Sequence, residues 1–215
     1  MQFKNCVITG GTSGLGLSLV KKFISEGFYL HIIAKDKKKI EQLAEYFKKK
    51  NLSSFKFYQA DLSEKKDINK VLFEIMKLES IDVLINNAGI TYSKKELNSN
   101  GYEKTFVVNY LSHFFLTNSL LNLIIKSKKA KIINISSFLH KFAKLNLDDL
   151  NHSKKYNGMI AYCNSKLMNL LFNYKINRLY NNKIKCYAIN PGWLNTNFGN
   201  NNRSILRFLL NFFRK

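Results

Sequence analysis

The chain has 215 residues, of which 46% are hydrophobic, and it carries a formal net charge of +21. This length and apolar fraction suit one domain with a sizeable core, and we expect a single domain over residues 1–215 because no linker or repeat divides the sequence. Three cysteines without a CxxC pair exclude a disulfide scaffold and favour a reducing compartment.

The strongly basic charge does not by itself indicate nucleic-acid binding. Lysine far outnumbers arginine, which base readout and phosphate forks favour, and the lysines are spread over the whole chain. Together with abundant asparagine, isoleucine and phenylalanine, this indicates the amino-acid bias of an AT-rich genome. We therefore expect no nucleic-acid partner. The four histidines lie far apart without metal-ligand spacing, so we also expect no metal site.

The N-terminus leads directly into a strand-like run. We expect no signal peptide and no bilayer-spanning segment, because no apolar stretch is long and clean enough, and we therefore expect a cytoplasmic protein. The basic, Phe- and Leu-rich tail at residues 204–215 has two interpretations. It can lie on a membrane surface as an amphipathic helix, which would make the protein peripheral, or it can cover the substrate site.

The first element in chain order is a short apolar strand over residues 6–8, followed by a glycine-rich turn and a helix. The turn reads TGGTSGLG over residues 9–16. Its glycines allow a tight bend and a close approach of the backbone to a pyrophosphate, and the helix N-terminus favours the negative charge. This order of strand, glycine turn and helix predicts a dinucleotide site.

A second strand over residues 29–33 ends at Ala34, Lys35 and Asp36. An acidic residue after this strand hydrogen-bonds the 2′-hydroxyl of the adenosine ribose, whereas a basic residue accommodates a 2′-phosphate. Because Lys35 comes before Asp36, we predict NADP(H) as the preferred cofactor. Asp36 leaves NAD(H) open.

Helices and strands then alternate as in doubly wound folds. A helix is predicted over residues 40–50, a strand over 55–58 and a helix over 64–77, in which Met76 is among the residues that point inward. The fourth strand, residues 82–85, is nearly all apolar, as expected of a buried parallel strand. It runs into the amides and small residues of NNAG, residues 86–89, which leave room for a ligand and offer it hydrogen bonds.

The second half begins with a long helix predicted over residues 101–125. Its apolar positions include Phe114, and Asn109 among them is a buried polar side chain that needs partners. A fifth strand over residues 131–135 ends at Ser136 and Ser137. Ligands bind at the carboxyl ends of the strands in open parallel sheets, which makes both serines candidates for the site.

Tyr162 and Lys166 lie four residues apart on a predicted helix and therefore on the same side of it. An ammonium beside a phenol favours the phenolate, so the pair can exchange a proton near neutral pH. The spacing alone arises by chance in a lysine-rich chain. After this helix, a sixth strand over residues 184–189 leads into PGWLNT, residues 191–196.

Taken together, these motifs resemble the short-chain dehydrogenase/reductase family from residue 4 to about residue 214. The resemblance is carried by TGGTSGLG, NNAG, YCNSK and PGWLNT, with Asp61-Leu62, Asn109 and the strand-end serines between them in the family's order. Within the family, VNYLSHF, IINISS and YNGMIAYCNSKLMNLLF look most like the retinol-dehydrogenase-like branch. That branch also has a long segment between the serine and the tyrosine.

The resemblance implies an α/β fold with a doubly wound, Rossmann-type parallel sheet in the order 3-2-1-4-5-6 and helices on both faces. It implies an oxidoreductase that transfers a hydride between NADP(H) and a small-molecule alcohol or carbonyl, either retinoid-, steroid- or lipid-like or another small carbonyl. Relatives continue into a substrate-binding helix, a further helix and a seventh strand. We therefore expect the seventh strand to be missing, the domain to be short at its C-terminus and the edge of the sixth strand to be exposed.

Four positions match the family's catalytic residues. Tyr162 would exchange a proton with the substrate oxygen, Lys166 would lower the pKa of Tyr162 and hold the nicotinamide ribose, and Ser137, rather than Ser136, would stabilise the substrate oxygen. Asn109 would kink its helix and hold a water in a proton path to Lys166. The positions that the resemblance assigns to the cofactor are Gly10, Thr12, Ser13, Gly14, Leu15, Gly16, Lys35, Asp61, Leu62, Asn87, Ala88, Gly89, Tyr162, Lys166, Pro191, Gly192 and Thr196.

The short C-terminus leaves three interpretations open. The chain is a minimal working enzyme, a truncated product with weak or no activity, or a subunit covered by another copy or another chain, as in a homo-oligomer. Two alternatives to the leading function are a protochlorophyllide-reductase-like enzyme, which shares the long Ser-to-Tyr segment, and a non-catalytic nucleotide-binding or scaffold protein.

Overall fold

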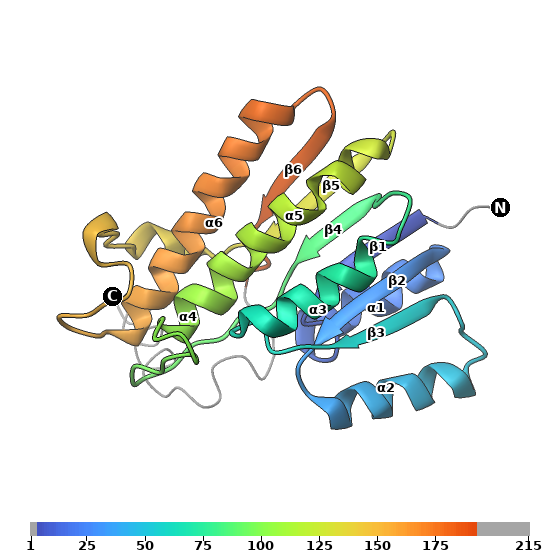
Figure 1. Cartoon of the computed structure of the whole chain (residues 1–215), viewed down its shortest axis with the longest axis horizontal. Helices are drawn as coiled ribbons and strands as arrows, with labels where there is room; N and C mark the ends of the chain where they lie inside the picture. The colour runs from blue at the N-terminus through green and yellow to red at the C-terminus, as the bar shows by residue number, and fades with distance from the viewer. Residues whose placement is uncertain (1–3, 193–215) are drawn as a thin grey trace.

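The computed structural model describes residues 4–192 of the chain. Six parallel strands form one sheet in the order β3-β2-β1-β4-β5-β6, with helices on both faces (Figure 1). The predicted doubly wound fold and strand order are thereby confirmed. The predictions for Thr196, the tail and a seventh strand fall on residues outside the described part.

Every predicted strand and helix is present, with ends that differ by a few residues. The strands are β1 (Lys4–Thr9), β2 (Phe28–Ala34), β3 (Phe55–Gln59), β4 (Val83–Asn86), β5 (Ala130–Ile135) and β6 (Ile184–Ile189). The helices are α1 (Gly14–Ser25), α2 (Lys37–Lys49), α3 (Lys65–Ile75), α4 (Lys104–Phe106), α5 (Ser112–Lys126) and α6 (Gly158–Tyr180). A π-helical turn (Val107–Leu111) joins α4 to α5, and two 3-10 turns (Phe138–Phe142 and Leu147–Asp149) precede α6.

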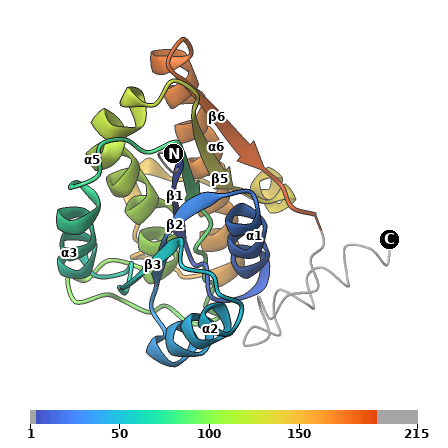
Figure 2. The ribbon, with the colours of Figure 1, turned by 90° about the vertical axis from the view of Figure 1, so that its right-hand side faces the viewer.

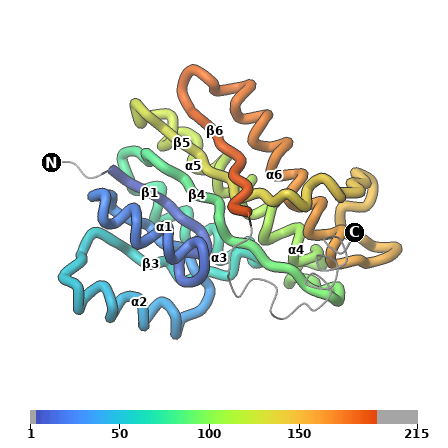
Figure 3. The backbone as a smooth tube through the Cα atoms, turned by 180° about the vertical axis from the view of Figure 1, so that it is seen from behind, coloured from blue at the N-terminus to red at the C-terminus, as the bar shows by residue number. Residues whose placement is uncertain are grey.

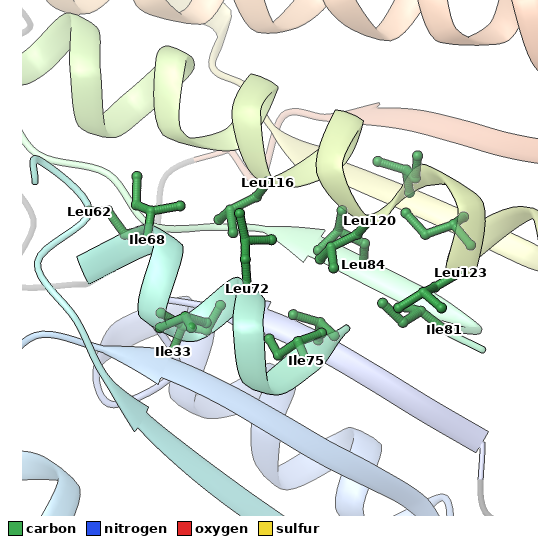
Figure 4. Close-up of a cluster of buried hydrophobic side chains, with 14 of the residues drawn as sticks. Ile33, Leu62, Ile68, Leu72, Ile75, Ile81, Leu84, Leu116, Leu120 and Leu123 are labelled. Atoms are coloured by element: carbon green, nitrogen blue, oxygen red, sulfur yellow. The ribbon is translucent and has the colours of Figure 1, made fainter. Parts of the chain in front are cut away.

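Two layers of apolar side chains hold the helices on the sheet. One core packs α3, α5 and α6 on one face, and a second packs α1 and α2 on the other (Figure 2). Figure 4 shows the first core, in which Leu72 of α3 and Leu116 and Leu120 of α5 meet Leu84 of β4. Burying each such leucine contributes about 1.5–3 kcal/mol. Both faces of the sheet therefore need helices to exclude water, as the apolar strand β4 predicts.

The long helix differs from the prediction at its start and in its middle. It begins at Lys104 rather than residue 101, because the Glu103 carboxylate accepts hydrogen bonds from the backbone N–H groups of Thr105 (2.8 Å) and Phe106 (2.7 Å). The π-helical turn then interrupts the α-helical hydrogen bonds around Asn109. The predicted distortion of the helix at Asn109 is therefore present.

Two residues predicted to be buried are exposed. Met76 is 56% exposed because it is the residue that ends α3, beyond the last buried turn. Phe114 of α5 is 40% exposed. The π-helical turn rotates α5 relative to an uninterrupted 3.6-residue period, and Phe114 lies at the rim of the core, where its ring centroid is 5.2 Å from that of the buried Phe172. Both predictions were wrong.

The parallel arrangement brings the carboxyl ends of all six strands to one edge of the sheet, where the chain turns at the ends of β1, β4, β5 and β6 (Figure 3). The predicted site residues follow these ends. On β6, Tyr187 and Ile189 are exposed. Within residues 4–192, no helix has the length and apolarity that crossing a membrane would require.

Candidate active site

The glycine turn between β1 and α1 folds tightly against the end of β4. Gly10 has a φ of +70°, and a Cβ on it would stand 2.9 Å from the Cα of Ala88. A Cβ on Gly16, in the first turn of α1, would overlap the carbonyl oxygen of Gly10. Only glycine fits at these two positions, as predicted for a turn that approaches a pyrophosphate.

The start of α1 has the properties of an anion site. Ser13 precedes the helix in an extended conformation, and its side chain makes no capping hydrogen bond. The first backbone N–H groups of a helix point away from its body and favour negative charge. This end of α1 therefore suits the pyrophosphate of a dinucleotide.

Thr9 joins the ends of β1 and β4. Its hydroxyl oxygen accepts hydrogen bonds from the backbone N–H groups of Asn87 and Ala88, both at 3.0 Å. The Asn87 side chain donates in return to the carbonyl oxygens of Thr9 (2.9 Å) and Gly10 (3.1 Å). This set of bonds holds the glycine turn at a fixed distance from the NNAG segment.

The two NNAG amides bind protein groups rather than presenting free donors, which corrects the expectation that their side chains would serve a ligand. Asn86 is buried, and its amide donates to Asn134 (2.8 Å) and Thr117 (3.0 Å). Asn87 donates to the glycine turn. The NH2 group of each amide is shielded from bulk water at a strand end and therefore donates to neighbouring protein oxygens.

Lys35 and Asp61 form an ion pair at the ends of β2 and β3, with 2.7 Å between Nζ and Oδ2. Burial opposes ionisation of Asp61, but hydrogen bonds from Lys35 and Ser63 outweigh it and lower the pKa of the carboxyl. The hydrogen bond to Asp61 raises the pKa of Lys35. Leu62 lies in the main core, so its side chain packs inside the protein.

Tyr162 and Lys166 lie on α6. The side-chain oxygen of Asn157 caps the N-terminus of this helix by accepting hydrogen bonds from the backbone N–H groups of Met159 and Ile160. Lys166 is only 3% exposed, its Nζ donates to the carbonyl oxygen of Ile135 at 2.8 Å, and it stands 5.4 Å from the centroid of the Tyr162 ring. The predicted pair is therefore brought together at the end of β5. Burial lowers the pKa of Lys166 to about 8.

The pKa of Tyr162 lies above its ordinary value, opposite to the direction predicted from its spacing to Lys166. Burial dominates and raises the pKa, whereas a side-chain hydrogen bond with Ser137 lowers it by less. The Tyr162 ring is almost completely buried, so removing its proton creates a poorly solvated phenolate. In this structure the phenol is protonated at neutral pH.

The two strand-end serines have different partners. Ser136 is buried, and its hydroxyl donates to the carbonyl oxygen of Lys166 at 3.1 Å. Ser137 is half-buried, accepts a hydrogen bond from the N–H of Leu139 at 3.2 Å and reaches Tyr162. The geometry thus agrees with the choice of Ser137, since its hydroxyl lies beside the phenol while that of Ser136 is used to hold α6.

Asn109 sits in the π-helical turn, fully buried. Its side chain pairs with the backbone of Ile90, accepting from N–H at 2.8 Å and donating to C=O at 2.9 Å, and its amide also donates to the Ser165 hydroxyl at 3.1 Å. Such π-helical turns frequently occur at functional sites. The water that Asn109 is predicted to hold stays a prediction.

The other predicted cofactor residues lie along the same edge. Thr12, Gly14 and Leu15 are in or beside the glycine turn, Gly89 follows Ala88, and Pro191 and Gly192 follow β6. Sequence reasoning missed Thr9, which binds Asn87 and Ala88, and it missed three residues that bind Asn109, namely His113, Ser165 and Asn169. The spacing of four between Asn109 and His113 in an apolar helix is a signal that could have identified His113. Within the described part of the chain, no group of three or more His, Cys, Asp and Glu side chains could hold a metal ion.

Comparison with known proteins agrees with this arrangement. The family model for short chain dehydrogenase matches residues 4–206. The chain is 34% identical over 199 residues to polyprenol dehydrogenase from Homo sapiens, covering 88% of this chain and 60% of that protein. It is also 34% identical over 193 residues to retinol dehydrogenase 12 from Homo sapiens, covering 88% of this chain and 61% of that protein.

The fold is likewise shared with solved structures. A crystal structure of an uncharacterized protein from Mycobacterium paratuberculosis superposes with a TM-score of 0.77 at 29% identity, covering 92% of this chain and 71% of that one. The chain spans about 60% of the length of the curated relatives named above. On the motifs, the fold and these matches, the chain belongs to the short-chain dehydrogenase family, in its retinol-dehydrogenase-like branch.

Proposed function

We propose that this protein is an NADP(H)-dependent oxidoreductase that interconverts an alcohol and the corresponding carbonyl compound. The observation that carries the proposal is the meeting of Ser137, Tyr162 and Lys166 at the sheet edge that also bears the glycine turn. Family membership supports the reaction class, since the curated relatives are named as dehydrogenases.

The residues present fit a dinucleotide. The close approach at Gly10 and Gly16 and the uncapped start of α1 suit the pyrophosphate, with Thr12, Ser13 and Leu15 beside it. Asp61, Ala88 and Gly89 would lie along the adenosine half, and Lys166 would hold the nicotinamide ribose. When bound, the nicotinamide supplies or accepts the hydride.

The chain's own residues supply the proton. In carbonyl reduction, Tyr162 would donate its phenolic proton to the substrate oxygen, and the raised pKa of Tyr162 keeps that proton in place. Ser137 would hydrogen-bond the same oxygen and stabilise the charge that develops there. A charged Lys166 within 5.4 Å of the Tyr162 ring would stabilise the phenolate left behind.

Lys35 supports NADP(H) over NAD(H), because it is the first basic group after β2, where a 2′-phosphate would lie. Lys35 is exposed and already paired with Asp61. A 2′-phosphate would therefore compete with Asp61 for the same ammonium, which predicts a moderate preference. NAD(H) binding stays open on this account.

The substrate class follows from the named relatives. Retinol and polyprenols are long apolar alcohols, so we propose a lipid-like alcohol or aldehyde as substrate. The half-buried Ser137 begins a segment with exposed apolar side chains, among them Phe138 and Leu147, which suits such a molecule.

Nucleotide titration tests the proposal most directly. NADPH and NADH are titrated against the full chain by fluorescence or calorimetry, and a panel of retinoid, prenyl, steroid and small aromatic aldehydes is then screened for NADPH oxidation. We expect saturable NADPH binding and turnover of at least one apolar aldehyde. Nucleotide binding without any turnover would indicate the non-catalytic alternative, and light-dependent turnover of a pigment would indicate the protochlorophyllide-reductase-like one.

A further inference from the structure

His113 lies one helical turn after Asn109 and is 1% exposed. Both of its ring nitrogens have partners. Nδ1 is 3.0 Å from the carbonyl oxygen of Asn109, and Nε2 is 3.2 Å from the hydroxyl oxygen of Thr9. The ring therefore bridges the π-helical turn and the end of β1, which belong to the two halves of the site.

The partners determine where the ring proton lies. A carbonyl oxygen can only accept, so Nδ1 must carry the hydrogen. The Thr9 oxygen accepts from the N–H groups of Asn87 and Ala88, so its hydroxyl acts as a donor, and Nε2 at 3.2 Å is a nearer acceptor than the carbonyl oxygen of Ile85 at 3.5 Å. A neutral imidazole with Nδ1–H satisfies every one of these bonds, and a charged one would leave Nε2–H without an acceptor.

The electrostatic surroundings agree with a neutral ring. Burial lowers the pKa of His113 to about 3, and the positive charge of Lys166 acts in the same direction, while the bond to the Asn109 carbonyl opposes them. His113 is thus a neutral imidazole at physiological pH, with both ring nitrogens engaged by Asn109 and Thr9. Its contribution to the site is therefore to position the groups that it binds, Asn109 and Thr9.

The π-helical turn explains why Asn109 needs this support. The Ser112 N–H donates to the carbonyl oxygen of Val107, five residues back, so the usual pattern of bonds is displaced. Side chains supply donors there instead. The Ser112 hydroxyl donates to Val108 C=O at 2.8 Å, and Asn109 C=O receives both His113 Nδ1 and, at 2.8 Å, the Asn169 amide.

We propose that His113, as a neutral Nδ1–H imidazole, is a positioning residue that fixes the Asn109 backbone relative to Thr9 and the segment after β4. This inference rests on the proposed function, because it assigns His113 to the geometry between the nucleotide half and the proton-transfer half of that site. The chain of bonds runs from Ala88 N–H through Thr9 and His113 to Asn109, and from the Asn109 amide to Ser165, between Tyr162 and Lys166 on α6.

The competing interpretation is an ordinary buried histidine whose loss only lowers stability. His31 provides the matched control. It is 3% exposed, burial lowers its pKa to about 4, and its ring nitrogens meet the Tyr58 hydroxyl at 2.9 Å and the Asn5 side-chain oxygen at 3.3 Å. Neither partner is a predicted site residue, so substituting His31 reports the effect of losing a buried, hydrogen-bonded imidazole alone.

The first test needs no enzymatic activity. The chain is labelled with 15N-histidine, and the ring resonances are followed between pH 5 and pH 8, with His113→Gln used for assignment. We expect His113 to stay neutral with the hydrogen on Nδ1 throughout. A ring that titrates in this range, or that carries its hydrogen on Nε2, overturns the proposal.

The second test separates the two ring nitrogens. The amide nitrogen of asparagine stands at about the position of histidine Nδ1, and that of glutamine at about the position of Nε2. His113→Asn can therefore still donate to Asn109 C=O, whereas His113→Gln cannot. We expect hydrogen exchange of the Asn109 side-chain amide to be about tenfold faster or more in His113→Gln, and close to the unsubstituted chain in His113→Asn.

Activity and stability complete the comparison. At a temperature well below the melting point of each variant, His113→Gln should lower kcat by about tenfold or more with the dissociation constant for NADPH within about threefold, and His113→Asn should retain most of kcat. His31→Asn should lower the melting temperature without changing kcat or Asn109 exchange.

If His113→Gln matches His31→Asn in all these measurements, His113 has only a structural role. If the unsubstituted chain binds no nucleotide, the proposed function fails, while the proton position and Asn109 exchange still decide whether His113 holds Asn109.

Discussion

The ammonium of Lys166 donates a hydrogen bond to the backbone carbonyl oxygen of Ile135 at 2.8 Å, which ties the middle of α6 to the end of β5. The same lysine is almost completely removed from water. One carbonyl dipole compensates only part of the lost hydration, and burial therefore lowers the pKa of Lys166 to about 8. The Lys166 ammonium, on which the proposed chemistry depends, therefore loses its proton at only slightly alkaline pH.

The charge state of Lys166 predicts a pH dependence of activity. Carbonyl reduction should be supported while Lys166 is charged and should decline as the pH rises through about 8, where the folded protein loses this proton. The measurement is kcat/KM against pH with NADPH saturating. Lys175→Met, an exposed lysine on the same helix, is the control and should leave the profile unchanged. A profile that stays flat to pH 10 would contradict the role of Lys166.

The same shift predicts an opposite trend in stability. Between pH 8 and 10.5 the unfolded chain keeps the Lys166 proton while the folded chain has lost it, so the unfolded state binds more protons. The contribution of Lys166 to the free energy of unfolding should therefore increase with pH across this window, by at most about 1.4 kcal/mol per pH unit. Urea unfolding of the unsubstituted chain and of Lys166→Met at several pH values measures the difference. A difference that does not change with pH would show that the lysine titrates normally.

Removing the Tyr162 hydroxyl should abolish proton transfer. Tyr162→Phe is expected to lower kcat by about 10²-fold or more while NADPH binding is retained, because the hydroxyl serves the substrate oxygen and the ring keeps its packing. Tyr174→Phe, on the same helix and 69% exposed, is the matched control and should behave like the unsubstituted chain. Turnover of Tyr162→Phe at the unsubstituted rate would eliminate Tyr162 as the acid.

A methyl group on Gly16 should damage the nucleotide site. The new Cβ would overlap Gly10 C=O and stand 2.5 Å from the Asn87 amide, so the glycine turn and the end of β4 must separate. We expect Gly16→Ala to weaken NADPH binding by about tenfold or more, since one misplaced hydrogen-bonded contact costs about that factor. Ser18→Ala, exposed on the same helix, provides the control. Equal NADPH affinity in the two variants would show that the turn does not hold the pyrophosphate.

Lys35 should determine cofactor preference. In Lys35→Ala the 2′-phosphate loses its ammonium and meets the unpaired Asp61 carboxylate, so NADPH affinity should fall by about tenfold while NADH affinity changes little. The ratio of the two dissociation constants, measured in the same buffer, is the readout. Lys37→Ala, an exposed lysine at the start of α2, should not change the ratio. An unchanged ratio in Lys35→Ala would show that Lys35 does not determine the preference for NADPH over NADH.

The order of the strands and helices and the residue types of the site follow from local patterns in the sequence. Apolar runs such as Val83–Ile85 have few structural solutions, because strands buried on both faces need helices above and below. Gly16 and the pair of Tyr162 and Lys166 are recognisable because their spacing is local. Local spacing places side chains on one turn or one helix face without knowledge of the rest of the chain.

The hydrogen-bond partners of these residues depend on the folded protein, because they come from segments far apart in the sequence. The Asn87 amide goes to Thr9 and Gly10, 77 or more residues away, rather than to a ligand. The pKa of Tyr162 is raised because the surrounding segments exclude water from the phenol. The spacing of four residues between Tyr162 and Lys166 gives no information about this burial. The link from Thr9 through His113 to Asn109 crosses 104 positions of sequence and exists because β1 and the π-helical turn meet in the folded protein.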